Sequence, residues 1–378
     1  MATNRTFAAP HKDRFYLPEL DGLRFFAFLA VFLSHIAVFS NGDSASRPAV
    51  VEFFNMFGRF GVDLFFALSA YLLTSLMLAE REKSGTLDLR SFYMRRLLRI
   101  WPLYFTWLGV LIVTRHVWSD YSVSFFVPFL LFGGNFAAAF GAVTSLVILP
   151  LWSLSVEEQF YIVWPLLFRK LTRRGVAVAG ITVLIFSTCA RFELLRAGMT
   201  PHQIWFIGFA RMGAIALGIL IAALPRYSNR VRGLWFLLGL VCWGDAALCH
   251  LYRMYPEGFV APMWGFSLAA FGAAAFLFAA IGIKRGSILT NPLCIQLGRI
   301  SYGMYVFHGA ALVLASRIVP AAPDPVFWPV FALVAFGLTL ALSVASYRWI
   351  ESPFLRMKKR YEVVRSAPLA PAMMRFAA

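Results

Sequence analysis

The segment from Asp21 to His35, DGLRFFAFLAVFLSH, is an apolar run that contains two costly residues, Arg24 near its start and His35 further along. They are 11 positions apart, which is almost three turns of an α-helix, so both side chains lie on one helix face, roughly 16 Å apart along the axis. In a helix that crosses a membrane, a cation then lies at one surface and an imidazole lies deep in the bilayer. The rest of the chain has to explain why both are tolerated.

The composition predicts an integral membrane protein. Of the 378 residues, 60% are hydrophobic and 14% are charged, whereas soluble domains carry about 25% charged residues. The net charge of +17 fits cytoplasmic loops and anionic lipid headgroups better than nucleic acid, which we do not expect as a partner. The four cysteines lie in or beside apolar segments without metal-ligand spacing, so we expect no metal site.

Ten apolar runs approach the roughly 20 residues that a helix needs to cross a bilayer. A further apolar stretch is interrupted by Pro128 and by Gly133 and Gly134, and we expect it to be re-entrant or interfacial, near 123–140. The fold class predicted is therefore all-α integral membrane, with about ten transmembrane helices. The runs cover about 23–40, 53–79, 100–114, 145–168, 176–190, 204–224, 234–252, 259–283, 292–318 and 327–350.

The distribution of positive charge predicts the orientation of these helices. If the N-terminus is inside and the runs alternate, 24 of the 35 Lys and Arg residues fall on inside segments and six on outside ones. Such a bias places both termini in the cytoplasm. We therefore expect a cytoplasmic N-terminal segment at 1–16, a transmembrane domain at 17–355, and a basic, disordered cytoplasmic tail at 356–378.

Three arginines, Arg95, Arg96 and Arg99, stand just before Trp101 and Pro102. Arg96 and Arg99 are three positions apart and share a helix face. Their planar guanidinium groups suit phosphate oxygens, which such groups bind in pairs. The cluster therefore indicates an anionic cosubstrate, although a positive anchor with an aromatic belt at the membrane surface has the same pattern.

Carboxylates also occur within the apolar runs. Asp63 lies four positions after Arg59, so the two can form an ion pair, either structural or functional. Glu157 and Glu158 are adjacent and point about 100° apart on a helix. We expect Glu157 to face the interior; the alternative is a short outer helix that exposes both to water. For His308, in a late apolar run, we expect a hydrogen bond between helices rather than catalysis.

A buried histidine, a buried carboxylate and a basic mouth together indicate group transfer. A neutral imidazole can take a proton from a hydroxyl and so make it a nucleophile. A carboxylate can orient that imidazole, and arginines can hold a phosphorylated donor. These residues predict transfer from a phosphate-bearing cytosolic donor to a hydroxyl acceptor, without naming the group transferred.

Six stretches in order resemble the acyltransferase-three family of integral-membrane O-acyltransferases, which modify bacterial surface glycans and some natural products. The resemblance implies a ten-helix core with cytoplasmic ends, an acyl-CoA donor, and an acceptor met at the far side. Ala70 departs from the pattern, because the family more often has glycine there. The stretches, between residues 17 and 354, are LPELDGLRFFAFLAVFLSHI, FGRFGVDLFFALSAYLLT, RRLLRIWPLYF, LWSLSVEEQFYIVWPLLF, SYGMYVFHGA and YRWIESPF.

The resemblance also implies roles for individual residues. Arg24 and His35 match the family's basic residue and histidine, with ten residues between them. Arg96 and Arg99 match its paired arginines, and with Arg24 and Arg95 they are expected to hold the phosphates of acetyl-CoA. His35 is the expected general base. The expected orienting groups, for the base or for the sugar, are Glu157 and Asp63.

The expected function is therefore O-acyl transfer, with acetyl as the first choice, to a carbohydrate or glycoside acceptor by a multi-pass protein of the bacterial inner membrane. The sequence does not identify the acceptor or the oligomeric state. A proton-coupled transporter or flippase would use the same histidine and carboxylates, but transporters of this size commonly show two similar halves, which this sequence lacks. A membrane sensor without catalysis is a third possibility.

Overall fold

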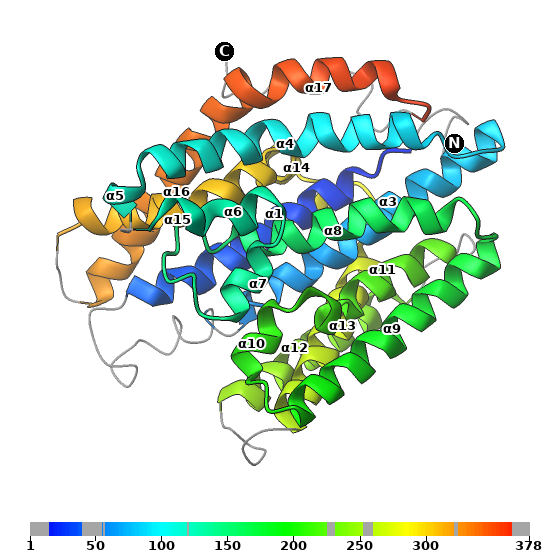
Figure 1. The fold of residues 1–378 in the computed structure, drawn as a ribbon, viewed down its shortest axis with the longest axis horizontal. Coiled ribbons are helices and arrows are strands. Elements are labelled where there is room, and N and C mark those ends of the chain that lie inside the picture. The colour runs from blue at the N-terminus through cyan, green and yellow to red at the C-terminus, as the bar shows by residue number, and fades with distance from the viewer. Residues whose placement is uncertain are drawn as a thin grey trace, which may run out of the picture.

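The computed structural model describes residues 15–39, 55, 57–118, 121–224, 231–251, 260–320 and 324–364. Every regular element within these ranges is a helix, as Figure 1 shows. The all-α architecture predicted from the sequence is therefore confirmed.

Helix α1 (Pro18–Ile36) runs through the interior of the assembly, between α3 (Gly61–Ser84), α14 (Pro292–Arg299) and α15 (Ser301–Ile318). Proline stands at its first position, where the missing N–H is no loss and the fixed φ suits a helix. Its apolar residues are buried on several faces, which explains why the run from Leu23 onward is almost continuously hydrophobic.

A second group of helices packs on the other side of α3. It consists of α9 (Arg173–Arg196), α11 (Gly213–Ala223), α12 (Arg232–Leu251) and α13 (Val260–Ala280). Both α11 and α13 contact α3, and α12 pairs with α13. In Figure 1 these green and yellow helices form the lower part of the molecule.

The remaining long helices are α4 (Leu89–Val113), α8 (Leu151–Phe168) and α16 (Asp324–Ser346). Asp88 begins α4, because its Oδ1 accepts a hydrogen bond from the Ser91 amide at 3.1 Å. A hydrogen bond from the Ser91 hydroxyl, and then that from the Ser91 amide, lower the pKa of Asp88, so its capping contribution is lost as the pH falls through this pKa. The short elements include η1 (Ala37–Phe39), α5 (Arg115–Trp118), α10 (Pro201–Phe206), η4 (Gly208–Arg211) and η5 (Ile288–Thr290).

Six helices of the described part are long and apolar enough to cross a membrane. They are α3, α4, α9, α12, α13 and the helix that starts with α16. The other four expected runs correspond to α1, α8, α11, and α14 with α15. Large apolar side chains are exposed along α9 and α12, including Ile185 and Leu237, as lipid-facing helices require. Several crossings are thus indicated, while the number ten and the orientation stay predictions.

The interrupted apolar stretch near 123–140 does not form one long helix. It contains η3 (Val123–Phe126), α6 (Val127–Leu130) and α7 (Gly134–Ala139), joined by tight turns. Phe132 adopts a left-handed backbone conformation with φ of 53°, which L-residues rarely adopt. The breaks thus fall near Pro128 and the two glycines.

The C-terminal segment differs from its expected form at its beginning. The chain continues from α16 through the wider turn η6 (Tyr347–Glu351) into α17 (Ser352–Lys358) and η7 (Lys359–Tyr361). Helix α17 packs on α4, above it in Figure 1. Residues 356–361, expected as disordered tail, are therefore helical. The rest of that tail from 365 and most of the N-terminal segment, 1–14, lie outside the described residues.

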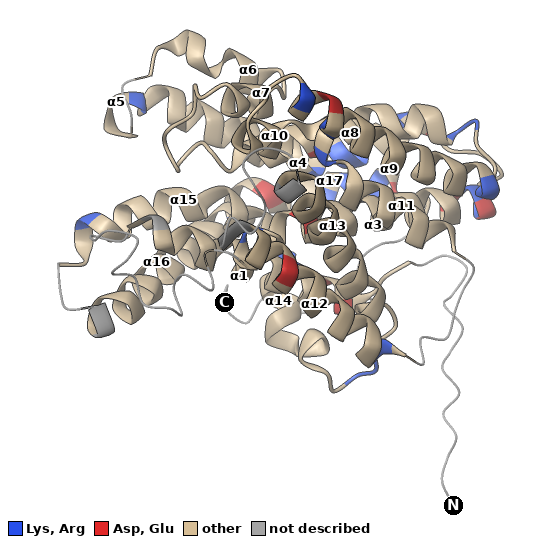
Figure 2. Cartoon of the chain, turned by 90° about the horizontal axis from the view of Figure 1, so that it is seen from below, with Lys and Arg blue, Asp and Glu red and all other residues tan. Residues whose placement is uncertain are grey.

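Positive side chains are distributed unevenly over the molecule. In Figure 2 several gather where α8 ends and α9 begins, whereas isolated ones lie near α5 and at the end of α15. The same end of the molecule carries Arg81 and Lys83, in the last turns of α3, and Arg90, at the start of α4. This is the end that the charge distribution predicts to face the cytoplasm.

Helices α1 and α3 approach closely because α3 begins at a glycine. A Cβ added to Gly61 would lie 2.5 Å from the backbone oxygen of Ala27, and one added to Gly58 would lie 2.1 Å from that of Ala30. Neither backbone oxygen can move without shifting α1, so small residues are required at this contact.

We predict that Gly61→Ala pushes α1 away from α3 and lowers the free energy of unfolding by about 1–3 kcal/mol, the usual range for overpacking. The measurement is thermal unfolding of the purified protein in detergent. Gly109→Ala on α4 is the matched control, because a Cβ there meets nothing within 4 Å. Equal melting temperatures for the two variants would contradict the close contact.

Candidate active site

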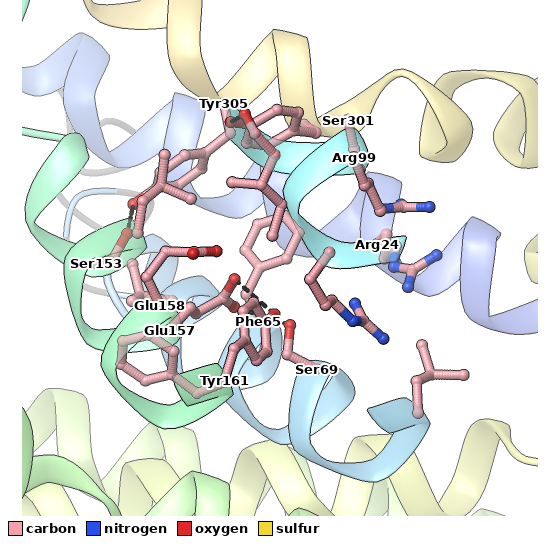
Figure 3. A pocket seen from close by; sticks show the side chains of 17 residues that line it. Arg24, Phe65, Ser69, Arg99, Ser153, Glu157, Glu158, Tyr161, Ser301 and Tyr305 are labelled. Carbon is pink, nitrogen blue, oxygen red and sulfur yellow. Dashed lines mark hydrogen bonds between the residues drawn. The ribbon is translucent and has the colours of Figure 1, made fainter. Parts of the chain in front are cut away.

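Two adjoining cavities lie at the N-terminal end of α1. The smaller, here called the inner cavity, has a volume of about 90 Å³ and lies between α3, α4, α8 and α15. Figure 3 shows Arg24 and Arg99 on one side of it and Glu157 and Glu158 on the other. Its polar lining comprises Arg24, Ser69, Arg96, Arg99, Ser153, Glu157, Glu158, Tyr161, Ser301, Tyr302 and Tyr305.

Glu157 lies at the centre of the inner cavity's hydrogen bonds. Ser69 donates to its Oε1 at 2.8 Å and Tyr161 donates to its Oε2 at 3.0 Å. Ala67 and Ala70, close to Ser69 on α3, pack against Gly218 of α11. The carboxylate is thus held by two neutral donors, with guanidinium groups across the cavity (Figure 3).

Glu158 lines the same cavity, although we expected only Glu157 to face the interior. It is 4% exposed, its Oε2 accepts a hydrogen bond from the Trp101 indole at 3.0 Å, and its Oε1 has no partner. The alternative of a short outer helix with both carboxylates in water is therefore wrong. Both are kept inside because α8 packs with α3 and α4 on either side.

The larger space, here called the basic cavity, has a volume of about 290 Å³ and shares Arg24, Arg96 and Arg99 with the inner cavity. Its wall comes from the N-terminal segment, α1, α3, α4, α14 and the C-terminal segment. Its lining holds seven cationic and three anionic side chains: Arg24, Arg95, Arg96, Arg99, Arg299, Lys358 and Lys359 against Asp21, Glu80 and Glu362.

Each of the three carboxylates already has a cation. Asp21 pairs with Arg24 at 2.9 Å, Glu80 with Arg95 at 2.6 Å, and Glu362 with Lys358 at 3.3 Å. Within the described part of the chain, no carboxylate lies within 4.0 Å of the cationic groups of Arg96, Arg99 or Lys359. The basic cavity therefore has an excess of positive charge at the point where it meets the inner cavity.

Asp21 also joins two further elements to α1. It accepts a hydrogen bond from the Tyr16 hydroxyl at 2.9 Å, and Arg299 of α14 lies 3.8 Å from it. Burial and the Asp21 carboxylate raise the pKa of Tyr16 to about 12, so this hydroxyl keeps its proton at neutral pH. The network holds Arg24 at the boundary between the two cavities.

Arg95 differs from its neighbours. Besides the Glu80 ion pair, its Nη1 donates to the backbone oxygen of Tyr361 at 2.6 Å. Arg95 lines the basic cavity, but its guanidinium group is committed to the contact between α3, α4 and the C-terminal segment. The guanidinium carbon of Arg96, by comparison, lies 5.2 Å from the centre of the Tyr161 ring and 6.0 Å from that of Phe92.

His35 lies at the other end of α1 and lines neither cavity. Its Nδ1 is 3.0 Å from Nε2 of His308 on α15, and Nδ1 of His308 is 2.6 Å from the backbone oxygen of Tyr305. The expected hydrogen bond between helices at His308 is therefore present, and its partner is His35. Tyr305 lines the inner cavity with its ring and so connects the cavity to this pair.

Asp63 is not placed with these residues. It forms an ion pair with Arg211 of η4, and the two side chains are 2% and 1% exposed. The guanidinium group of Arg211 stacks on the Trp205 ring at 4.0 Å. The expected pairing with Arg59 is wrong, because Asp63 faces η4 while Arg59 bonds to Asn55. Asp63 lines neither cavity and contacts neither His35 nor Glu157.

Sequence reasoning missed several residues of the two cavities. The sequence contains a signal for two of them. Tyr161 lies four positions after Glu157 in an apolar run, and Ser69 directly precedes the small residue Ala70 in another. No sequence signal identifies the other three, Arg299, Lys358 and Lys359, because charged residues at the ends of helices are usual at a membrane surface. Among the residues described, no three His, Cys, Asp or Glu side chains come together as a metal site would require.

Comparison with known proteins finds relatives among bacterial O-acetyltransferases. The chain is 28% identical over 369 residues to YrhL of Bacillus subtilis, whose name provisionally assigns it peptidoglycan O-acetylation, and covers 55% of it. It is 27% identical over 375 residues to the peptidoglycan O-acetyltransferase OatA of Listeria monocytogenes, covering 56% of that protein. These alignments take in 89% and 90% of the chain, which thus spans about half the length of these relatives. No solved structure matches it.

A family model described as an acyltransferase domain matches residues 17–348. This range begins just before α1 and ends within η6, so it takes in the inner cavity and all of the basic cavity except Phe15, Tyr16 and the C-terminal segment. The match extends over most of the 378 residues, and the chain therefore belongs to the acyltransferase-three family of membrane O-acyltransferases.

Proposed function

We propose that this chain is an integral-membrane O-acyltransferase that moves an acetyl group from cytosolic acetyl-CoA to a hydroxyl of a carbohydrate acceptor. The observation that carries the proposal is the positive charge without carboxylate partners at Arg96 and Arg99, where the basic and inner cavities meet. Partly buried cations are costly when unpaired. A bound polyanion removes that cost, and coenzyme A is one.

The donor would occupy both cavities at once. Its phosphates would bind in the basic cavity to Arg24, Arg96 and Arg99, because guanidinium groups bind phosphate oxygens in pairs. Its thioester would pass the shared wall at Leu72 into the inner cavity. Arg95 would support this site rather than bind CoA directly, since Glu80 and the Tyr361 backbone already hold it.

The size of the inner cavity supports a short acyl group. A volume of about 90 Å³ suits a two-carbon group better than a fatty chain. The aromatic rings of Phe65 and Tyr305, whose centroids are 5.6 Å apart, line this cavity and would limit the length of the acyl chain.

His35 would act as the general base. The acceptor hydroxyl would lie between His35 and the end of the inner cavity at Tyr305, so that His35 takes its proton while the oxygen attacks the thioester carbonyl carbon. The carbon–sulfur bond then breaks, the thiolate of CoA leaves, and the proton held on His35 passes to that sulfur. The products are an ester and free CoA, and no further reactant is needed. Glu157 would line the path of the thioester rather than orient His35, which it does not contact.

The acceptor would reach His35 from the opposite membrane face. The basic cavity lies at the predicted cytoplasmic end of the molecule, and His35 is three turns away along α1. Relatives named for peptidoglycan O-acetylation make a peptidoglycan sugar the first acceptor to test. A bacterial inner membrane with both termini in the cytoplasm fits this arrangement.

We predict that Arg99→Gln raises the KM for acetyl-CoA by about 10- to 100-fold, as loss of a hydrogen bond to a charged group would, with a smaller effect on kcat. The measurement is CoA release by the purified protein with soluble peptidoglycan fragments. Arg196→Gln removes the same charge from an exposed helix end and should leave KM unchanged. An unchanged KM in Arg99→Gln would contradict the donor site.

For His35→Ala we predict a fall in the rate of acetyl transfer to these fragments by about 100-fold or more, the usual contribution of a general base. Binding of acetyl-CoA, measured by calorimetry, should persist because His35 lines neither cavity. A variant that acetylates at the normal rate would overturn the assignment. No transfer by the unaltered protein to any glycan acceptor would overturn the proposed function.

Phe65→Ala should extend the inner cavity and so admit a longer acyl group. We predict that kcat/KM for butyryl-CoA rises by about 10-fold or more relative to kcat/KM for acetyl-CoA, because each methylene bound in a hydrophobic pocket changes specificity by about this factor. Both donors are compared in the same CoA-release assay. Phe136→Ala, an exposed aromatic on α7, serves as the control. A ratio that does not change would show that Phe65 does not limit the acyl chain.

A further inference from the structure

We propose that His308 is a positioning residue that holds His35 in the tautomer whose Nε2 carries no proton and is ready to accept one. This inference rests on the proposed function, in which His35 is the general base. It starts from two contacts only, one to each ring nitrogen of His308.

The contact to Tyr305 assigns the proton on His308. Its Nδ1 lies 2.6 Å from the backbone oxygen of Tyr305, and a carbonyl oxygen can only accept a hydrogen bond. Nδ1 must therefore carry a proton, because a bare nitrogen at this distance would place two lone pairs against each other. In the neutral ring, Nε2 is then a hydrogen-bond acceptor.

The second contact transmits this assignment to His35. Nε2 of His308 lies 3.0 Å from Nδ1 of His35, so Nδ1 of His35 has to be the donor. A neutral His35 with its proton on Nδ1 has a free lone pair on Nε2. In the described part of the chain the side-chain hydrogen bond of His35 uses Nδ1, which leaves Nε2 for an acceptor hydroxyl.

The same pair suits the charged state that follows. When Nε2 of His35 takes the proton of the hydroxyl, Nδ1–H remains directed at the lone pair of His308, and the bond becomes charge-assisted. A neutral imidazole thus does what a carboxylate does in a catalytic triad, holding the base in the correct tautomer and orientation. No carboxylate in the described part of the chain forms a salt bridge with His35 or His308.

The fold keeps His308 in place for this task. Its side chain is fully buried, its ring packs edge-on against Phe28 of α1 with centroids 6.1 Å apart, and Gly309 permits close contact with Leu146. Tyr305, one helical turn earlier, lines the inner cavity and bonds through its hydroxyl to Ser153 at 2.6 Å (Figure 3). A single turn of α15, from Tyr305 to His308, therefore contacts both the inner cavity and His35.

A pair of substitutions separates positioning from packing. In His308→Gln the amide oxygen can accept the Nδ1–H of His35 much as Nε2 does, whereas His308→Leu fills similar space without an acceptor. We expect His308→Leu to lose kcat by about 100-fold with an unchanged Kd for acetyl-CoA, and His308→Gln to recover at least 10-fold of that loss. Thr74→Val, which removes the buried hydrogen bond from Trp164 to Thr74, should keep the kcat of the unaltered protein.

The tautomer can be observed without any turnover. In protein labelled with ¹⁵N-histidine, the His35 signals, identified by their loss in His35→Ala, should show a protonated Nδ1 and a bare Nε2. They should change to a mixture of tautomers in His308→Leu and return to one tautomer in His308→Gln. A protonated Nε2 on neutral His35 in the unaltered protein would overturn the proposal.

The kinetic outcomes distinguish the two hypotheses. If His35→Ala abolishes transfer but His308→Leu retains the full kcat, positioning by His308 is wrong and the proposed function stands. If His308→Gln is as inactive as His308→Leu while both bind acetyl-CoA normally, the hydrogen-bond acceptor is not what matters, and the proposal also fails. Normal transfer by His35→Ala contradicts the general base itself, and with it the premise of the inference.

Discussion

The excess of guanidinium groups over carboxylates at the N-terminal end of α1 is the constraint on which the rest of the structure depends. Asp21 balances Arg24 and holds Arg299 and Tyr16 nearby, but Arg96 and Arg99 keep their charge without a carboxylate. Partial burial of such charge costs free energy, which the packing of α1 and α4 among their neighbours has to offset. An anion that fits the cavity would lower that cost, and this is the reason for proposing a polyanionic donor.

Helices α1 and α15 connect this site to the far end of the molecule. Helix α1 carries Arg24 at the cavities and His35 three turns later, and α15 places Tyr305 in the inner cavity and His308 against His35. Both helices are largely buried, so the distance between the proposed phosphate site and the proposed general base is set by helix geometry rather than by loops. The arrangement suits a reaction in which donor and acceptor arrive from opposite sides.

The sequence predicted those features that local pattern determines. Apolar runs located the long helices, and spacing grouped Arg96 with Arg99 and Arg24 with His35. Contacts between distant segments had no local signal: Asp63 pairs with Arg211, 148 positions later, and His35 with His308, 273 positions later. The helical start of the C-terminal segment was missed for a similar reason. Arg95 of α4 and Lys83 of α3 donate hydrogen bonds to the backbone of this segment, whereas its composition alone predicts a polar, disordered tail.

The most direct test of this account is a structure of the protein with a non-hydrolysable acetyl-CoA analogue in lipid nanodiscs. The account predicts phosphate oxygens within hydrogen-bond distance of Arg96 and Arg99, and the acetyl group in the inner cavity beside Glu157 and Tyr305. An analogue bound away from the basic cavity, or with its acetyl group directed out of the inner cavity, would contradict it.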